Sequence, residues 1–493
     1  MGRLDDAREI ATFGLELVQA YRRTTAPRSA IRALQAKRLR AVLDAAARTR
    51  FYASNNGGRE FRSLQDVKPV RKSELLERID ESVLDPALTK ARLLTFVNGG
   101  GAPGDTILDK YIVATTSGTT GQVGVFVDDL DGWARQRAVV FARMFQGLLR
   151  PEGFALLARR RYRLAFVVAH SGHTLTSILA SRVPKVGRAF ADSHVLSIDA
   201  PLNDVVNELN EIEPMLLHSY PTFLEVLAGE KRKGRLRIEP EIITAGSEPT
   251  SQQCRDVVRA AFPRVRFVET YAATECLAMA TACPHGALHV NEDACILEPV
   301  DDDFRAVPMG ITAPRLLVTN LLNLVQPLVR YELTDSIELD DSPCPCGSPF
   351  LKCRVHGRTD DTFFLVDEAG RAQVHPPIPL ESALLGLSGL LQYQLVHERQ
   401  NRLRLAFVVD SGGDAGLAQG VAEALELRLV RYLDEHGLLN EVSFVVEQVD
   451  AIERHARSKK LRQITSRVAR PDSAPTVPAS EVRARNPLRP PRR

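Results

Sequence analysis

The sequence predicts an α/β protein in which a large N-terminal domain of mixed sheets and helices precedes a small α+β C-terminal domain. The chain has 493 residues, which is too many for one ordinary hydrophobic core. Its first 90 residues carry apolar positions at helical spacing, and residues 91–356 alternate short apolar runs with amphipathic segments. A further pattern, of paired strands and one long helix, begins near residue 357. These three textures define the predicted organisation.

Residues 1–90 are expected to form the helical beginning of the large domain. In AIRALQAKRLRAVLDAAART, from Ala30, apolar residues recur every three or four positions and so share one helix face. The first residues carry acids at helical period instead of the apolar block of a signal peptide. No uncharged run approaches the roughly 18–20 residues that cross a bilayer. We therefore expect a cytoplasmic protein without a transmembrane segment.

Residues 91–356 are expected to form the core of the large domain, where short buried strands end in small or polar residues. In α/β folds, the loops at the carboxyl ends of strands gather the groups that bind ligands. The predicted strands include FALLA from 154, LAFVVA from 164, PMLLHSY from 214, EIITAGS from 241 and RVRFVETYA from 264.

Residues 357–470 are expected to form the small domain, and residues 471–493 a disordered basic tail. GRTDDTFFLVDEAGRAQVHP resembles a hairpin, and a helix is expected near residue 380. LQYQLVHE and RLRLAFVVD predict paired strands, followed by a helix over about 415–435 and the strand VSFVVEQV. The tail is rich in Pro, Ser and Arg and cannot bury enough apolar surface to order itself.

The net charge of +3 conceals an uneven distribution. From residue 454 onward the chain carries twelve Lys or Arg and two acids, so the preceding part sums to −7. The body is therefore not expected to bind nucleic acid specifically, and the basic character belongs to the tail. A solvated tail is the simpler interpretation, and electrostatic contact with RNA or anionic lipid is the alternative.

The stretch VATTSGTTGQVG, residues 113–124, follows an apolar run and contains no charge. Its hydroxyls and glycines suit a loop in which the backbone wraps an anion such as phosphate. It lacks the lysine of a P-loop, because Gln122 follows Gly121, where that lysine would be expected. Taken alone, the stretch fits a polar hairpin turn as well as an anion cradle.

Four later motifs follow this loop in a telling order: ITAGSEPTS (243–251), YAATEC (271–276), PLVRYELTDSIEL (327–339) and HGRTDD (356–361). Together the five stretches resemble the adenylate-forming superfamily, and within it the phenylacetate–coenzyme A ligases and their capsule-biosynthesis relatives. The resemblance extends from about residue 34 to about residue 464. Each motif is weak by itself, and the specificity lies in their order.

The resemblance implies an ATP-dependent, AMP-forming acid–thiol ligase. Such enzymes use ATP and Mg²⁺ to convert a carboxylic acid to an acyl-adenylate, and a thiol, usually that of coenzyme A, then displaces AMP. The small domain rotates between the two half-reactions, with Asp360 at the expected pivot. A small-molecule acid is the expected partner, and a homodimer is compatible with the sequence. The acid is not specified, and the acceptor could instead be a carrier-protein thiol, an amine or a hydroxyl.

The resemblance also implies residue roles. Glu275 would bind Mg²⁺, Thr274 would contact the α-phosphate, and Asp335 would hold the ribose. Arg358 would approach the ribose or the phosphate from the hinge. The β- and γ-phosphates would lie in the loop of Thr116, Ser117, Gly118, Thr119, Thr120 and Gly121; the adenine would lie beside Gly246, Ser247, Glu248 and Pro249; Tyr220, Pro221 and Tyr271 would wall the acyl pocket, and Tyr271 also counts among the nucleotide-site residues.

A catalytic lysine is expected in RSKKLRQI, near the end of the small domain. In this family a lysine there stabilises the pentavalent phosphate and the attacking carboxylate as a point charge. Lys460 is the candidate, with Lys459 at the position where a glycine is usual. The alternative is a solvent-exposed run of charges.

The seven cysteines do not suggest a disulfide framework, because their number is odd and no signal peptide is evident. Cys283, His289, Cys344 and Cys346 instead offer three thiolates and one imidazole, the ligand set of a structural zinc site. Related ligases often show a similar set. Cys353 or His285 could replace one ligand, and cytosolic thiols that merely pack are the alternative.

Three departures from the family pattern leave two hypotheses open. Gln122 and Val123 replace the usual lysine and its neighbour, and RYELTD replaces a ribose motif of the RYRTGD type. In the segment before that motif, Pro314 and Arg315 stand where a Gly and a Glu are common. Losing the loop lysine removes a positive charge from the triphosphate site. The chain is therefore expected to be an active ligase, or alternatively a weakened nucleotide-binding relative that acts as a partner in a biosynthetic assembly.

Overall fold

The computed structural model spans the whole chain. It describes residues 3–55, 57, 60–116, 124–146, 162–169, 173–182, 191–358, 361–375, 380, 383–384, 387, 389–409, 415–454 and 461–468. The loop residues Ser117–Gly121, Gln122, Asp360, Lys460 and the tail from residue 471 lie outside these ranges, so the hypotheses about them stay predictions.

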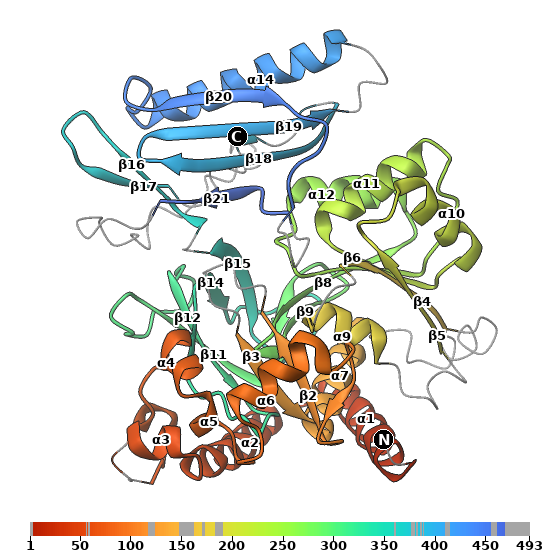
Figure 1. Cartoon of the computed structure of the whole chain (residues 1–493), viewed down its shortest axis with the longest axis vertical. Coiled ribbons are helices and arrows are strands. Elements are labelled where there is room, and N and C mark those ends of the chain that lie inside the picture. Colours follow the sequence, from red (N-terminus) through yellow and green to blue (C-terminus); the bar gives the residue numbers. More distant parts are fainter. Residues whose placement is uncertain are drawn as a thin grey trace.

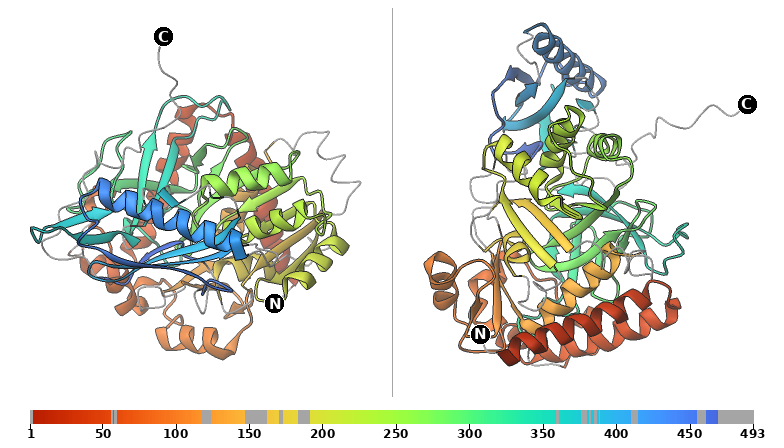
Figure 2. Two further views of the ribbon diagram at one scale, coloured as in Figure 1. Left: turned by 90° about the horizontal axis from the view of Figure 1, so that it is seen from above. Right: turned by 90° about the vertical axis from the view of Figure 1, so that its right-hand side faces the viewer.

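Six α-helices lie within residues 3–95, where the sequence has apolar positions at helical spacing. Figures 1 and 2 show them in red and orange at the base of the molecule, with α1 and α2 running along it. Buried apolar side chains such as Ile31, Val42 and Leu43 lie on the inner face of α2. The helices are α1 (Arg3–Arg23), α2 (Arg28–Ala47), α3 (Arg50–Asn55), α4 (Lys72–Glu77), α5 (Ile79–Ser82) and α6 (Lys90–Thr95).

Nine of the described strands form the largest sheet, in the order β14-β15-β10-β9-β8-β7-β6-β4-β5. The strands from β5 to β8 are parallel, and those from β8 to β14 are antiparallel. The parallel part confirms four of the predicted strands; FALLA lies outside the described residues. The bounds are β4 (Tyr162–Val168), β5 (Ala191–Ser197), β6 (Leu216–Ser219), β7 (Ile242–Ala245), β8 (Arg266–Ala273), β9 (Cys276–Ala282), β10 (Leu288–Val290), β14 (Asp335–Asp340) and β15 (Lys352–Arg358).

Helices and two smaller sheets complete this large part of the molecule. The strands on either side of residues 117–123, β2 and β3, pair antiparallel, and the choice between a polar turn and an anion cradle for those residues stays a prediction. The helices are α7 (Leu130–Met144), α9 (Leu175–Ser181), α10 (Leu202–Ile212), α11 (Pro221–Arg232) and α12 (Gln252–Ala261). The strands are β1 (Thr106–Ile107), β2 (Tyr111–Thr115), β3 (Val125–Asp129), β11 (Cys295–Val300), β12 (Arg315–Asn320) and β13 (Tyr331–Leu333).

The C-terminal part is a four-stranded sheet with one long helix and its own hydrophobic core. Figure 1 shows it above β15, with α14 on its outer side. The predicted hairpin, paired strands and long helix are all confirmed, and the expected helix near residue 380 is represented by helical residues 380, 383 and 384. The elements are β16 (Phe363–Val366), β17 (Ala372–His375), β18 (Leu390–Arg399), β19 (Arg402–Val409), α14 (Ala415–Glu435), β20 (Ser443–Gln448) and β21 (Ile464–Ser466).

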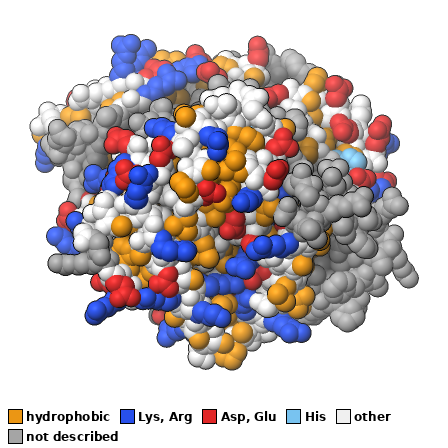
Figure 3. Space-filling view, turned by 60° about the horizontal axis from the view of Figure 1, so that its bottom comes forward, with side chains coloured by type: hydrophobic (Ala, Val, Ile, Leu, Met, Phe, Trp, Pro, Cys, Tyr) orange, Lys and Arg blue, Asp and Glu red, His pale blue; other side chains and the backbone are white. Residues whose placement is uncertain are grey.

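None of the described helices is both long and apolar enough to cross a bilayer. On the face that Figure 3 shows, acidic, basic and hydrophobic side chains are interspersed.

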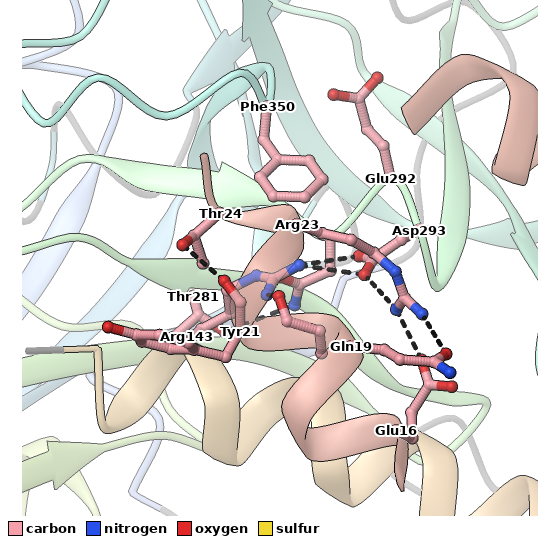
Figure 4. A network of polar contacts seen from close by, with 12 residues as sticks. Glu16, Gln19, Tyr21, Arg23, Thr24, Arg143, Thr281, Glu292, Asp293 and Phe350 are labelled. Carbon is pink, nitrogen blue, oxygen red and sulfur yellow. Dashed lines mark hydrogen bonds and ion pairs between the residues drawn. The ribbon is translucent and has the colours of Figure 1, made fainter. Parts of the chain in front are cut away.

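A buried ion cluster ties α1 to the large sheet. Asp293, whose side chain is fully buried, lies 3.0 Å from Nη1 of Arg23 and 3.0 Å from Nη2 of Arg143. Arg23 also contacts Glu16 at 2.6 Å, and Figure 4 shows these side chains meeting between α1, α7 and the strand region. Burial by itself would raise the pKa of Asp293, but the surrounding guanidinium groups outweigh it and lower the pKa.

The Asp293→Asn substitution is expected to lower the free energy of unfolding by about 3–5 kcal/mol, because it leaves buried arginine charges uncompensated. Chemical denaturation monitored by circular dichroism measures the change. Glu60→Gln is the matched control, since Glu60 pairs with Arg40 on the surface and such pairs contribute about 0–1 kcal/mol. Equal stability losses in the two variants would contradict this prediction.

Candidate active site

Some of the predicted site residues lie where β8, β9, β13 and the β14–β15 pair meet the β2–β3 hairpin, beside Thr116. Glu275 and Thr274 lie in the turn between β8 and β9. The Glu275 side chain is buried, and the Tyr331 hydroxyl donates a hydrogen bond of 3.3 Å to its Oε1. Burial raises the pKa of Glu275, while the charges of Lys72 and Arg358 oppose this effect. A buried carboxylate among cationic groups is therefore the centre of the site.

Two buried amides hold the turn that carries Glu275. Oε1 of Gln136, on α7, accepts hydrogen bonds from the Leu277 amide at 3.1 Å and from Nδ2 of Asn320 at 3.2 Å. Nδ2 of Asn320 also donates to the carbonyl oxygen of Glu275 at 3.1 Å. Both side-chain amides are almost completely buried, and they hold the two peptide groups on either side of Cys276, the residue that follows Glu275.

Further buried side-chain amides next to Asn320 hold the β2–β3 hairpin, whose strands flank the polar loop of residues 117–123. Asn323 donates to the Val127 carbonyl at 2.7 Å, and Gln326 accepts from the Val127 amide at 2.8 Å. Oδ1 of Asn320 in turn accepts from the Asn323 amide. These residues lie outside all the sequence motifs described above. Their signal is the three-residue spacing of Asn320, Asn323 and Gln326 within an otherwise apolar stretch.

The polar loop has a well-defined base at Thr116 and Gly124. The Thr116 amide donates to the Gly124 carbonyl at 2.9 Å, and the Gly124 amide donates to Oγ1 of Thr116 at 2.7 Å. A Cβ at position 124 would lie 2.7 Å from the Phe126 ring, so the close approach requires glycine. Nζ of Lys72 donates to the same Thr116 hydroxyl at 3.2 Å.

The predicted ribose residues lie together beside this centre. The Tyr271 hydroxyl donates to Oδ2 of Asp335 at 2.8 Å, and burial together with Asp335 raises the pKa of Tyr271 well above its usual value. Arg358 lies opposite Asp335 in the β14–β15 pair and donates to the Thr334 hydroxyl at 2.8 Å. The structure thus brings Tyr271, Asp335 and Arg358 together, and their binding roles stay predictions.

The predicted adenine and acyl residues follow β6 and β7. A Cβ at Gly246 would lie 2.8 Å from Oγ1 of Thr270, so the backbone passes close to β8 there. Ser247 has a φ of 70°, and its hydroxyl lies 3.4 Å from that of Thr176. Pro249 is exposed, whereas Tyr220 is buried and its hydroxyl accepts from the Ala169 amide at 3.2 Å.

His218, on β6, is a further polar residue of this region, and no sequence motif predicted a role for it. Its Nδ1 lies 2.8 Å from Oγ1 of Thr244. Burial lowers the pKa of His218 to about 4, so the ring is neutral at neutral pH. Its sequence signal is weak, because a single histidine in an apolar strand is most often a packed core residue.

Glu248 connects the large part to the C-terminal segment. Its Oε1 accepts a hydrogen bond of 2.6 Å from the Leu461 amide, and its Oε2 accepts one of 2.8 Å from the Thr222 hydroxyl. Nη1 of Arg454 lies 3.7 Å from Oε1. Burial raises the pKa of Glu248, against the opposing effect of Arg454. The predicted adenine role of Glu248 stays a prediction, while its described contacts join two parts of the chain.

The four predicted metal ligands form one compact cluster. Their donor atoms all lie within 4.8 Å of one another, with 3.9 Å between Sγ of Cys283 and Cys344. Nε2 of His289 lies 3.3 Å from Sγ of Cys346, and Nδ1 lies 3.0 Å from the Phe350 carbonyl. An Nδ1–H that donates to this carbonyl leaves the Nε2 lone pair facing the thiols, as in zinc-binding histidines. Cys353 and His285 do not belong to the cluster that these described residues form.

The donor set fits zinc. Four sulfur and nitrogen atoms around Zn²⁺, with Zn–S of about 2.3 Å, would be separated by roughly 3.8 Å in a tetrahedron, close to the observed spacing. All seven cysteines are free thiols, so no disulfide competes for these sulfurs.

Comparison with solved structures identifies the fold of this chain, whereas comparison of sequences does not. No protein-family model matches the sequence, and no curated protein is significantly similar to it. Among solved structures, 2-hydroxyisobutyryl-CoA ligase in the postadenylation state with R3-HIB-AMP aligns with 90% of this chain and 91% of its own, at a TM-score of 0.66 and 19% identity. The fold is that of an adenylate-forming ligase.

The same ligase has been solved in other states, and the adenylate-forming fold is recovered in each. Its thioesterification state with 2-HIB-AMP and CoA gives a TM-score of 0.53 at 19% identity, over 90% of this chain and 91% of that chain. Its open conformation gives 0.53 at 17% identity, over 90% and 93%. The present arrangement of the adenylate-forming fold is thus more similar to the postadenylation state.

The Glu248→Ala substitution is expected to loosen the C-terminal segment, because the Leu461 amide and Arg454 lose their buried acceptor. Hydrogen exchange at residues 461–468 should accelerate by about tenfold or more, as for loss of a hydrogen bond to a charged group. Mass spectrometry of exchanged peptides measures this. Glu239→Ala removes an exposed carboxylate that contacts Lys231 and serves as control. Unchanged exchange in Glu248→Ala would contradict the inferred connection.

Proposed function

We propose that this protein is an ATP-dependent, AMP-forming acid–thiol ligase of the phenylacetate–coenzyme A ligase type. One observation carries the proposal: the buried Glu275 lies with cationic groups, the base of the polar loop and the Asp335–Tyr271 pair in one place. The adenylate-forming fold supports it, because neighbours with this fold were solved with acyl-AMP compounds and CoA.

The proposed first half-reaction joins the acid to AMP. A carboxylate oxygen of the acid attacks the α-phosphorus of ATP, a new C–O–P linkage forms, and the bond from the α-phosphorus to the bridging oxygen breaks. Its electron pair leaves with pyrophosphate, and no proton transfer is required. Arg358 would offset charge near the α-phosphate and ribose, and Asp335 would orient the ribose hydroxyls.

The Glu275 carboxylate fits a Mg²⁺ site. Mg²⁺ is usually bound through one or two carboxylates together with substrate phosphates and waters, and Glu275 is the carboxylate beside the loop base. When bound, the ion would supply positive charge for the triphosphate. Tyr331 orients the carboxylate through its hydroxyl.

In the proposed second half-reaction, a thiolate, usually that of coenzyme A, attacks the carbonyl carbon of the acyl-adenylate. A C–S bond forms, the C–O bond to AMP breaks, and the thiol proton passes to solvent. Lys460 would act in the first half-reaction, where its charge would meet the attacking carboxylate. In support, the residue that follows it, Leu461, is held by Glu248.

The function is tested by carboxylate-dependent ATP–pyrophosphate exchange over aryl, fatty and amino acids, with detection of the acyl-AMP by mass spectrometry. We expect exchange with at least one acid class. The second candidate function, a weakened nucleotide-binding relative, is favoured by Gln122 at the position of the usual lysine. ATP binding by calorimetry without exchange across the panel would support it and exclude the ligase.

We also infer that Cys283, His289, Cys344 and Cys346 bind one structural Zn²⁺. Four protein donors leave no open position for substrate, as in structural and unlike catalytic zinc sites. The cluster connects the β9–β10 turn to the loop before β15. Zinc would therefore stabilise the antiparallel end of the large sheet without taking part in the chemistry.

A further inference from the structure

The described cations around the loop base include one from an unexpected part of the chain. The loop itself has no lysine, because Gln122 occupies the usual position. Lys72, 44 residues before Thr116, donates from Nζ to the Thr116 hydroxyl at 3.2 Å. Its positive charge therefore lies at the point where the polar loop leaves β2.

Lys72 is also close to the carboxylate at the centre of the site. Burial has the largest effect on the pKa of Glu275 and raises it. The positive charge of Lys72 has the next largest effect and lowers it. The Lys72 ammonium group donates to the hydroxyl at the loop base and its charge acts on the buried carboxylate, so it would face the phosphates of the proposed reaction. Lysine binds phosphate as a compact, flexible point charge.

The backbone fixes Lys72 in register with the residues of the site. Val70 forms a bridge to Tyr331, whose hydroxyl bonds Glu275. The Val70 amide donates to the Arg330 carbonyl, and the Glu332 amide donates to the Val70 carbonyl, both at 2.9 Å. Lys72 follows two residues later as the first residue of α4, and the buried Leu75 anchors this helix in the core.

We propose that Lys72 is the phosphate-binding cation of this site and replaces the charge that the loop lacks at Gln122. The inference rests on the proposed function. Lys72 would contact the β- and γ-phosphates of ATP and stabilise the negative charge that accumulates on pyrophosphate as it leaves. A purely structural role, in which Lys72 only supports Thr116, would need a hydrogen-bond donor and no charge.

The test separates charge from hydrogen bonding. Lys72→Gln keeps a donor for Thr116 and removes the charge, whereas Lys72→Arg keeps both. Lys68→Gln is the matched control, because Lys68 is an exposed lysine in the same segment. Calorimetry measures the Kd of MgATP, pyrophosphate and AMP for each full-length variant, with thermal unfolding as a check on folding.

We expect Lys72→Gln to weaken MgATP and pyrophosphate binding by about 10–100-fold, as for one lost charge-assisted contact. Binding of AMP, which lacks the β- and γ-phosphates, should stay within about twofold, and Lys72→Arg should recover most of the affinity. The Lys68→Gln control should bind all three ligands like the unmodified protein.

Two results would overturn the inference, and they are distinguishable from failure of the proposed function. Unchanged MgATP binding in a folded Lys72→Gln variant would leave Lys72 with a structural role only. Equal losses for MgATP and AMP would exclude a specific role at the β- and γ-phosphates. If the unmodified chain bound neither ATP nor pyrophosphate, the proposed function itself would fall together with the role of Lys72.

Discussion

Replacing Glu275 with Gln is expected to reduce pyrophosphate exchange by about 10²–10³-fold. The amide keeps the size of the side chain and an acceptor for Tyr331 but cannot offer a negative charge to Mg²⁺. Loss of one preorganised electrostatic group at a site of developing charge typically has this effect. Initial rates of exchange over a series of Mg²⁺ concentrations measure it, and the variant should also require more Mg²⁺ for half-maximal rate.

The same substitution is not expected to destabilise the protein. Because burial raises the pKa of Glu275, the native state favours the protonated carboxyl, and its contribution to stability is lost as pH rises through the raised pKa. Gln cannot ionise, so at neutral pH the variant does not lose the stability that the unmodified protein loses when Glu275 becomes charged. The Tm of Glu275→Gln at pH 7 should therefore equal or exceed that of the unmodified protein, whereas a merely structural Glu275 would give a lower Tm.

Glu298→Gln provides the matched control for this experiment. Glu298 lies on β11, outside the site, and burial raises its pKa as it does that of Glu275. Its Oε2 lies 3.2 Å from Nε of Arg330. Its exchange rate should stay within about twofold of the unmodified protein, as expected away from the reacting groups. Similar exchange rates for the two variants would refute the assignment of Glu275.

The Cys346→Ser substitution is expected to abolish stoichiometric zinc and to lower the Tm by about 5 °C or more. A structural metal stabilises the native state because its ligands are assembled only after folding. Elemental analysis of the purified protein gives the zinc content, and thermal unfolding with and without a chelator gives the stability. The chelator should lower the Tm of the unmodified protein and should leave the Tm of the Cys346→Ser variant unchanged.

Cys353→Ser controls for the loss of a buried thiol. Cys353 is a buried cysteine of β15 outside the metal cluster, so this variant should keep one zinc and its sensitivity to the chelator. Unmodified protein that contains no zinc and unfolds at the same temperature with a chelator would show that the four residues only pack together.

Much of the fold could be predicted because the elements are encoded locally. The apolar runs that became β4, β6, β7 and β8 are short and end in polar residues, and the periodicity of α14 extends over 21 residues. The resemblance implied that Asp335 and Arg358 would both lie near the ribose, whereas Tyr271 was expected to wall the acyl pocket. The loop Ser117–Gly121 and Lys460 lie outside the described residues, so their roles rest on the resemblance alone.

The rest of the site depends on contacts that no local pattern contains. In the sequence, nothing distinguishes Lys72 from other polar residues of helices. Its place in the site depends on the bridge between Val70 and Tyr331, which are 261 residues apart in the chain. Gln136 supports Glu275 only because α7 packs beside β9, and a single glutamine in an amphipathic helix carries no such information. Long-range pairing therefore decided which cation and which amides belong to the site.

The ion pairs of Asp293 also constrain the order of events during biosynthesis. Arg23 can contact Glu16 within α1, but Asp293 is synthesised 270 residues later, and the Val329 carbonyl that bonds the Tyr52 hydroxyl is synthesised 277 residues after Tyr52. At ribosomal rates of about 5–20 residues per second, this delay lasts roughly 15–55 s. For that time the apolar faces of the N-terminal helices remain without the parts of the large sheet on which they pack in the folded protein.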